Sequence, residues 1–132
     1  MLSGIGAPTM RRTGWRWTKA ANVGTLAYAV FCLSNPDHLA KGAGHQPGQG
    51  WRTVAYVFAA RDSVLSGLSL GLSGSHLPLL VKLRIAADIG DSAIFATQAA
   101  AGSKLKTAGV AATWGVLNAA AYYLDQRSRG RR

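Results

Sequence analysis

The chain has 132 residues, a length that suits a single domain. Its 15 Lys and Arg residues outnumber 5 Asp and Glu residues, so the formal net charge is +10 and an anionic partner is expected, either nucleic acid or a membrane surface. Cys32 is the single cysteine, which excludes an intrachain disulfide and a cysteine-based metal site, and we expect no metal and no cofactor.

The positions of the basic residues distinguish the two kinds of partner. Eight of them lie outside the apolar segments, four before the first segment and four after the last: Arg11, Arg12, Arg16, Lys19, Arg127, Arg129, Arg131 and Arg132. Basic residues flank membrane-spanning helices in this way on the cytoplasmic side, whereas nucleic-acid-binding domains spread them over one face. We therefore expect a multi-pass protein of the cell membrane with both termini in the cytoplasm. A soluble nucleic-acid binder is the alternative.

Composition favours a tightly packed bundle. Apolar residues make up 48% of the chain, and 16 residues are glycine. The mean hydropathy of +0.10 is low for a membrane protein, because the apolar segments contain much Ala, Gly, Ser and Thr. Small residues allow transmembrane helices to approach closely, so the low value is compatible with helices packed in a bilayer.

In chain order, the sequence predicts a basic N-terminal arm (1–18), a four-helix transmembrane domain (19–125) and a basic C-terminal tail (126–132). The four expected helices cover residues 20–35, 51–72, 77–100 and 107–124. Segments of roughly 16 to 24 residues match a hydrocarbon core of ~30 Å at ~1.5 Å per residue. The fold class expected is therefore all-α, an integral membrane four-helix bundle, with the bilayer as partner and the loop 36–50 outside the cell.

A polar stripe follows one face of the third expected helix. Its members are spaced by four, three, four and three residues: Arg84, Asp88, Asp91, Phe95 and Gln98. Arg84 and Asp88 can pair along the helix. Because a bare charge is costly in hydrocarbon, the stripe is expected to face the interior of the bundle or a wet cavity.

The second expected helix contains a complementary pair of charges, Arg61 and Asp62. If the second and third helices are antiparallel neighbours, Arg61 reaches the depth of Asp88. We predict that Arg61 lies within salt-bridge distance of Asp88 or Asp91. Arg61 and Asp62 point about 100° apart as helical neighbours, so they need not pair with each other.

Two interpretations of these charges compete. In the functional one, the charges lie in the wall of a small apolar pocket that binds or transforms a lipophilic small molecule. The catalytic candidates are then Asp88, Asp91 and Arg61. The substrate-binding candidates are Arg84, Phe95, Gln98 and Asp62. Two carboxyl groups this close favour one that keeps its proton, which places a general acid beside a general base. In the structural one, the charges only set the helix register, and the chain is a non-catalytic membrane subunit or scaffold of a larger complex. Whether the chain is an enzyme stays open.

A third alternative is a small transporter or proton path. It would use polar side chains in the apolar segments, namely Asn22, Gln98 and Asn118. A bundle of this size would need to form a homo-oligomer to provide a polar route to both faces.

The pattern Arg61-Asp62, a Gly-rich helix end and then Arg84, Asp88 and Asp91 resembles a family of small four-helix membrane proteins of bacteria and fungi. That family is classed mainly as a domain of unknown function and is similar in architecture to the DoxX-like proteins. The resemblance covers about residues 51–124 and implies a four-span bundle with an internal polar site. Some fungal relatives occur in natural-product pathways as epoxide-opening enzymes. The resemblance thus implies acid and base roles for Asp88 and Asp91, with Arg61 and Arg84 as orienting cations.

Overall fold

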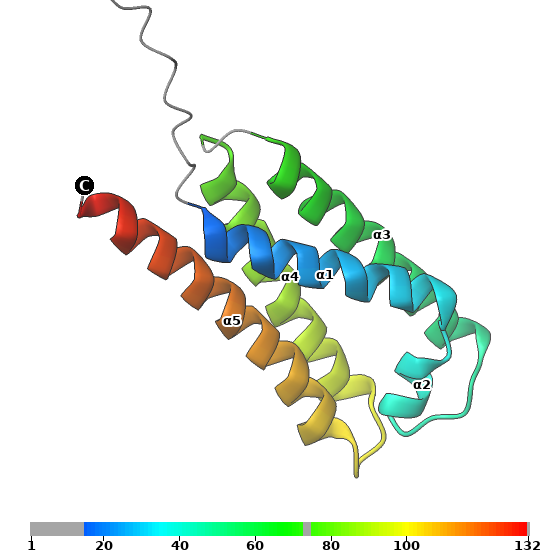
Figure 1. The fold of residues 1–132 in the computed structure, drawn as a ribbon. Helices are drawn as coiled ribbons and strands as arrows, with labels where there is room; N and C mark the ends of the chain where they lie inside the picture. Colours follow the sequence, from blue (N-terminus) through cyan, green and yellow to red (C-terminus); the bar gives the residue numbers. More distant parts are fainter. Residues whose placement is uncertain (1–14, 73–74, 132) are drawn as a thin grey trace, which may run out of the picture.

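The computed structural model describes residues 15–72 and 75–131, and these residues form an all-helical protein (Figure 1). Its helices in chain order are α1 (Arg16–Ser34), α2 (His38–Gly42), α3 (Gln49–Gly71), α4 (Leu77–Gln98) and α5 (Lys104–Gly130). Most of the expected basic arm, up to residue 14, lies outside the described residues. So do residues 73–74 and 132.

The four expected helices are present, with differences at their ends. α1 starts four residues before the expected 20, so residues 16–18 of the expected arm are helical. α2 is an additional short helix inside the segment expected to be a loop, residues 36–50. α5 starts three residues before the expected 107 and continues to Gly130, so residues 126–130 of the expected basic tail are helical. Arg127 and Arg129 lie in its last turn, where cationic side chains interact favourably with the helix dipole and stabilise the end of a helix.

The four long helices pack as two pairs. α1 lies along α3 and α4 lies along α5, and these two contacts are the most extensive in the described part of the chain. α1 also contacts α5, mainly toward the end where both termini lie, and the two helices diverge toward the opposite end (Figure 1). α3 and α4 contact each other less. The sequence suggests that α3 and α4 pack along their length as antiparallel neighbours. In the structure their side chains meet at a few positions instead.

Asp125 of α5 joins the first turn of α1 to the last part of α5. Its carboxylate accepts hydrogen bonds from the backbone N–H groups of Trp17 (3.2 Å) and Thr18 (2.7 Å). These N–H groups have no partner inside their own helix, so a carboxylate from another helix serves as their cap. Trp15 stacks on Tyr122 of α5, with ring centroids 5.7 Å apart, and adds an apolar contact between the start of α1 and the last part of α5.

The interior contains both apolar and polar side chains. Among the described residues, the buried apolar ones include Leu39, Phe58, Leu77 and Phe95. Buried residues include many polar or charged ones: Thr18, Asn22, Thr25, Asp62, Ser66, Ser69, Arg84, Asp88, Asp91, Asn118 and Asp125. The outer surface instead exposes large apolar side chains on all four long helices, among them Val30, Leu33, Val57, Val64, Leu79, Ile89, Val116 and Leu117. Among the described residues, no helix reaches the combined length and mean hydropathy by which a membrane-spanning helix is recognised.

Candidate functional site

Arg61 and Asp91 connect α3 to α4 through a two-pronged ion pair. Arg61 Nη1 and Nη2 donate to Asp91 Oδ1 and Oδ2, both at 2.7 Å. The planar guanidinium fork matches the two carboxylate oxygens, which is the geometry that strengthens such pairs. The predicted contact between Arg61 and Asp91 is therefore confirmed. Arg61 Nε also donates to Asp62 Oδ1 at 2.9 Å, so these sequence neighbours do pair, because the long Arg side chain bends back along the helix.

Arg84 is the second cation of the network and is almost fully buried, with 3% of its surface exposed. Its Nη1 donates to Asp62 Oδ1 at 2.7 Å, and its Nη2 donates to Ser66 Oγ at 2.9 Å. The expected pair of Arg84 with Asp88 along α4 is not formed. The physical reason is that α3 offers Arg84 an ionised carboxylate already in place beside a hydroxyl group, which together satisfy more of its donors than Asp88 would.

Asp88 is consequently left without an ion pair. It is buried, with 4% of its surface exposed, and its Oδ2 has no hydrogen-bond partner among the described residues. It approaches α5 at Gly115, where an added Cβ atom would lie 3.1 Å from Asp88 Cβ and 3.7 Å from Oδ2. The missing side chain at Gly115 is what allows the Asp88 side chain to fit between the two helices. Buried polar atoms are rarely left unpaired, so this oxygen is a candidate for contact with a ligand.

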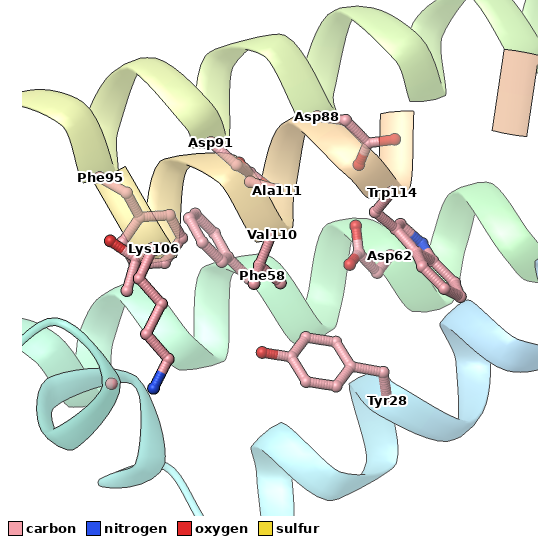
Figure 2. A pocket seen from close by; sticks show the side chains of 12 residues that line it. Tyr28, Phe58, Asp62, Asp88, Asp91, Phe95, Lys106, Val110, Ala111 and Trp114 are labelled. Atoms are coloured by element: carbon pink, nitrogen blue, oxygen red, sulfur yellow. The ribbon is translucent and has the colours of Figure 1, made fainter. Parts of the chain in front are cut away.

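A pocket of about 350 Å³ lies in front of these carboxylates, between the two helix pairs. Figure 2 shows its side chains converging from α1, α3, α4 and α5. Its apolar wall is formed by Phe58, Phe95, Val110, Ala111 and Trp114, and its polar lining side chains include Tyr28, Asp62, Asp88, Asp91 and Lys106. A mainly apolar pocket with a few polar groups is the usual form of a small-molecule site.

Among the predicted site residues, Asp62, Asp88, Asp91 and Phe95 line this pocket. Arg61 and Arg84 lie behind the carboxylates as their partners. Gln98 does not join the site. It is exposed, and only its backbone carbonyl is engaged, as the acceptor for His45 Nε2 at 2.9 Å. Gln98 is the last residue of α4, near the end of the pocket wall, so the helical spacing placed it on the right face but beyond the site.

Tyr28, Lys106 and Trp114 line the pocket and were not predicted from the sequence. Tyr28 contacts His38 of α2, with its hydroxyl 2.8 Å from Nε2. Trp114 Nε1 donates to Thr25 Oγ1 at 3.0 Å, which fixes the indole between α1 and α5. Aromatic residues in apolar segments and a lysine at a helix start are common, so only the arrangement of the helices around the pocket identifies them. Among the described residues, no group of three or more metal-ligating side chains is present.

The fold and the site together define an α-helical bundle with a buried Arg–Asp network and an adjoining apolar pocket. In comparisons with family models, curated proteins and solved structures, none matches this chain. The assignment of a function therefore depends on the chemistry of the pocket itself.

Proposed function

We propose that this protein is an integral membrane protein whose pocket binds a lipophilic small molecule and presents Asp88 to it as an acid–base group. The observation that supports this proposal best is the position of Asp88. Its carboxyl group is buried in the wall of the pocket, and Oδ2 has no partner among the described residues. Such a group can donate a hydrogen bond when protonated and accept one when ionised, so its bonding capacity is available to a ligand.

The membrane part of the proposal is supported by large apolar side chains on the surface and by charged side chains in the interior. Large apolar residues such as Val57, Leu79 and Val116 are more than half exposed, while some charged residues, such as Asp91, are buried. An extended apolar surface is costly in water and favourable in hydrocarbon. Ionisable residues in membrane proteins face the interior and pair with one another, as Arg61 does with Asp91.

The low hydropathy of the individual helices has a structural explanation under this proposal. Mean hydropathy counts every residue of a helix, including those that face its neighbours. In α4 the inward face contains Arg84, Asp88 and Asp91, all buried, whereas Leu79, Leu83 and Ile89 point outward. Only the outward side chains would meet lipid. A bundle with a polar interior can therefore have an apolar perimeter and a modest mean hydropathy at the same time.

The contacts suggest different roles for the charged residues. Both oxygens of Asp91 are held by Arg61, and Asp62 is bound by Arg61 and Arg84. These four residues form one ion-pair network, although Arg84 keeps a buried Nε without a partner, so we assign them a structural and orienting role. Asp88 is the pocket carboxylate that lies outside the ion pairs of the described residues, and it is the acid–base candidate. The sequence suggested both Asp88 and Asp91 as acid–base residues, and the proposal keeps Asp88.

The resemblance noted from the sequence suggests epoxide opening as the reaction. In its protonated form Asp88 would give its proton to the epoxide oxygen as a C–O bond breaks. A water molecule would then add to the carbon atom and return a proton to the Asp88 carboxylate. Epoxide and water give a diol, and Asp88 is regenerated, so one carboxyl group acts first as acid and then as base. Loss of a neighbouring C–H proton to Asp88 instead of water addition would give an allylic alcohol, an isomerisation.

The enzymatic proposal is tested with 1,2-epoxydodecane and the purified protein in neutral phosphatidylcholine nanodiscs. Diol and allylic alcohol are measured by mass spectrometry. Asp88→Asn should abolish turnover and leave the melting temperature within a few degrees of wild type. Asp91→Asn should lower the melting temperature, because it breaks the pair with Arg61. Wild-type turnover that Asp88→Asn leaves unchanged would exclude the acid–base role.

A non-catalytic scaffold is the second candidate, and the paired part of the network favours it. Arg61, Arg84, Asp62 and Asp91 hold α3 and α4 together in the way that a purely structural role requires. Binding without turnover in the nanodisc assay would support this alternative. Resistance of the full-length protein to carbonate extraction from cell membranes tests the membrane location that both candidates share.

A further inference from the structure

The pocket has a different polar group at each end. Lys106 lies in the first turn of α5, and Asp88 contacts the same helix at Gly115, nine residues further on. At ~1.5 Å per residue these two levels are about 14 Å apart along the helix axis. Figure 2 shows Lys106 and Asp88 at opposite ends of the pocket, with Val110 and Ala111 of α5 between them.

The walls between these two ends are apolar. Phe58 and Phe95 meet edge to face, with ring centroids 6.1 Å apart, and Trp114 lies across from them on α5. These side chains offer surface for a hydrocarbon chain and few groups that could pair with a polar one. A ligand that fills the pocket is therefore expected to be apolar over most of its length.

Lys106 differs from the other cations near the pocket in its bonding state. Arg61 and Arg84 are committed to Asp91 and Asp62 by bonds of 2.7 Å. Lys106 forms no ion pair with any described residue, although it lines the pocket. Figure 2 shows its ammonium group and the Tyr28 hydroxyl at the part of the pocket away from Asp88. The Tyr28 hydroxyl already contacts His38 Nε2 at 2.8 Å, so Lys106 is the group at this end that suits the anionic head of an amphiphile.

We propose that the ligand of this pocket is a single-chain amphiphile with an anionic head, a carboxylate or a phosphate, bound at Lys106. Its apolar chain extends past Phe58 and Trp114 toward Asp88, where the reacting or recognised group lies. This inference rests on the proposed function and names the substrate class of that same site. The place of Lys106 in the first turn of α5 also suits the headgroup level of a bilayer, where lysine directs its ammonium toward water.

A cationic amphiphile is the competing occupant. Its head would be drawn to Asp88, where Oδ2 lacks a partner. Lys106 would repel that head during entry, and the carboxylates of Asp62 and Asp91 are already neutralised by arginine. The charges thus favour an anionic head at the Lys106 end over a cationic head at the Asp88 end.

Three ligands with the same chain length test this inference: dodecanoate, dodecanol and dodecyltrimethylammonium. Binding is measured by calorimetry at alkaline pH, with the full-length protein in phosphatidylcholine nanodiscs and empty nanodiscs as the blank. Dodecanoate should bind up to roughly fivefold more tightly than dodecanol, the upper end of the range for one exposed ion pair. Lys106→Gln should remove this difference. Lys104→Gln should preserve it, because Lys104, which like Lys106 is exposed, does not line the pocket.

Other results would overturn the inference. If dodecanoate and dodecanol bind with equal affinity, or if Lys106→Gln and Lys104→Gln change the affinity equally, the anionic head does not bind at Lys106. Tightest binding of dodecyltrimethylammonium would assign the head to Asp88. In each of these cases binding persists, so the proposed lipophilic site stands. If none of the three ligands binds, both the inference and the proposed function are wrong.

Discussion

At the scale of single residues, the two arginines differ in whether their removal leaves a buried carboxylate without a cation. Arg61 binds both oxygens of Asp91, whereas Asp62 is bound by both Arg61 and Arg84. Loss of Arg61 therefore strands the Asp91 carboxylate. Loss of Arg84 leaves Asp62 with a cation still in contact. The more buried arginine is thus expected to be the less costly one to remove.

We expect Arg61→Met to lower the free energy of unfolding by about 3 kcal/mol and Arg84→Met by about 1–2 kcal/mol. Arg61→Met combined with Asp91→Leu should recover more than half of the first loss, because no charge is then stranded. Denaturation in mixed micelles of mild detergent and dodecyl sulfate measures these variants and Asp91→Leu alone. Strictly additive effects of the Arg61 and Asp91 substitutions would count against their pairing.

The second residue-scale prediction concerns Gly115, which lies against Asp88. Gly115→Val should destabilise the protein by about 1–3 kcal/mol, because the added carbons must displace the Asp88 side chain. It should also reduce binding of dodecanol at the pocket. Gly109→Val on the same helix is the matched control, since nothing lies within 4 Å of its added Cβ, and its stability should stay within about 0.5 kcal/mol of wild type. Thermal unfolding with and without dodecanol separates the two effects.

At the scale of helices, the junction between α1 and α5 depends on a contact between residues that are far apart in the sequence. Asp125, near the end of the chain, caps the N-terminus of the first helix. Arg129 adds to this junction by lying 4.4 Å from the centre of the Trp15 ring, a distance at which cation and ring attract. The two terminal helices therefore hold each other in place beside the pocket.

Asp125→Ala should reduce the free energy of unfolding by about 2 kcal/mol, since it removes a charged acceptor from two N–H groups of α1. The adjacent Gln126→Ala is the control. Gln126 contacts only the exposed Tyr122 hydroxyl, so its effect should stay within about 0.5 kcal/mol. Hydrogen exchange should report faster exchange of the first turn of α1 in Asp125→Ala. Unchanged exchange there would show that the cap is dispensable.

At the scale of the whole molecule, both described ends of the long-helix bundle are basic. The terminal end includes Arg16, Lys19, Lys82, Arg127, Arg129 and Arg131, and the opposite end includes Lys41, Arg52, Lys104 and Lys106. The terminal end has more of these cations, and positive residues accumulate on the cytoplasmic side of membrane proteins. The orientation expected under the proposed function therefore has both termini in the cytoplasm.

Labelling of single cysteines in intact cells measures this orientation. In a Cys32→Ala background, Gln46→Cys should react with a membrane-impermeant maleimide, because the segment between α2 and α3 is expected outside. Arg131→Cys should react only after the cells are permeabilised. Both positions are exposed in the structure, so a difference in labelling reports the side of the membrane. The reverse pattern would invert the topology, and labelling of both in intact cells would contradict a membrane-spanning arrangement.

What the sequence determined by itself is local. Proline positions, apolar segments and helical spacing predicted the four long helices and the shared face of Arg84, Asp88, Asp91 and Phe95, because these depend on contacts within three or four residues. Charge and depth limited the expected partner of Arg61 to Asp88 or Asp91, and the structure shows that it is Asp91. The tertiary structure decided the rest. The choice of Asp62 over Asp88 as the partner of Arg84 depends on how α3 meets α4, and the space that Gly115 leaves for Asp88 depends on how α4 packs against α5. Tyr28, Lys106 and Trp114 reach the pocket because α1 and α5 lie beside the other two long helices. Contacts between distant segments depend on which of many side chains compete for the same partner. The local spacing of residues in the sequence does not predict the result of that competition.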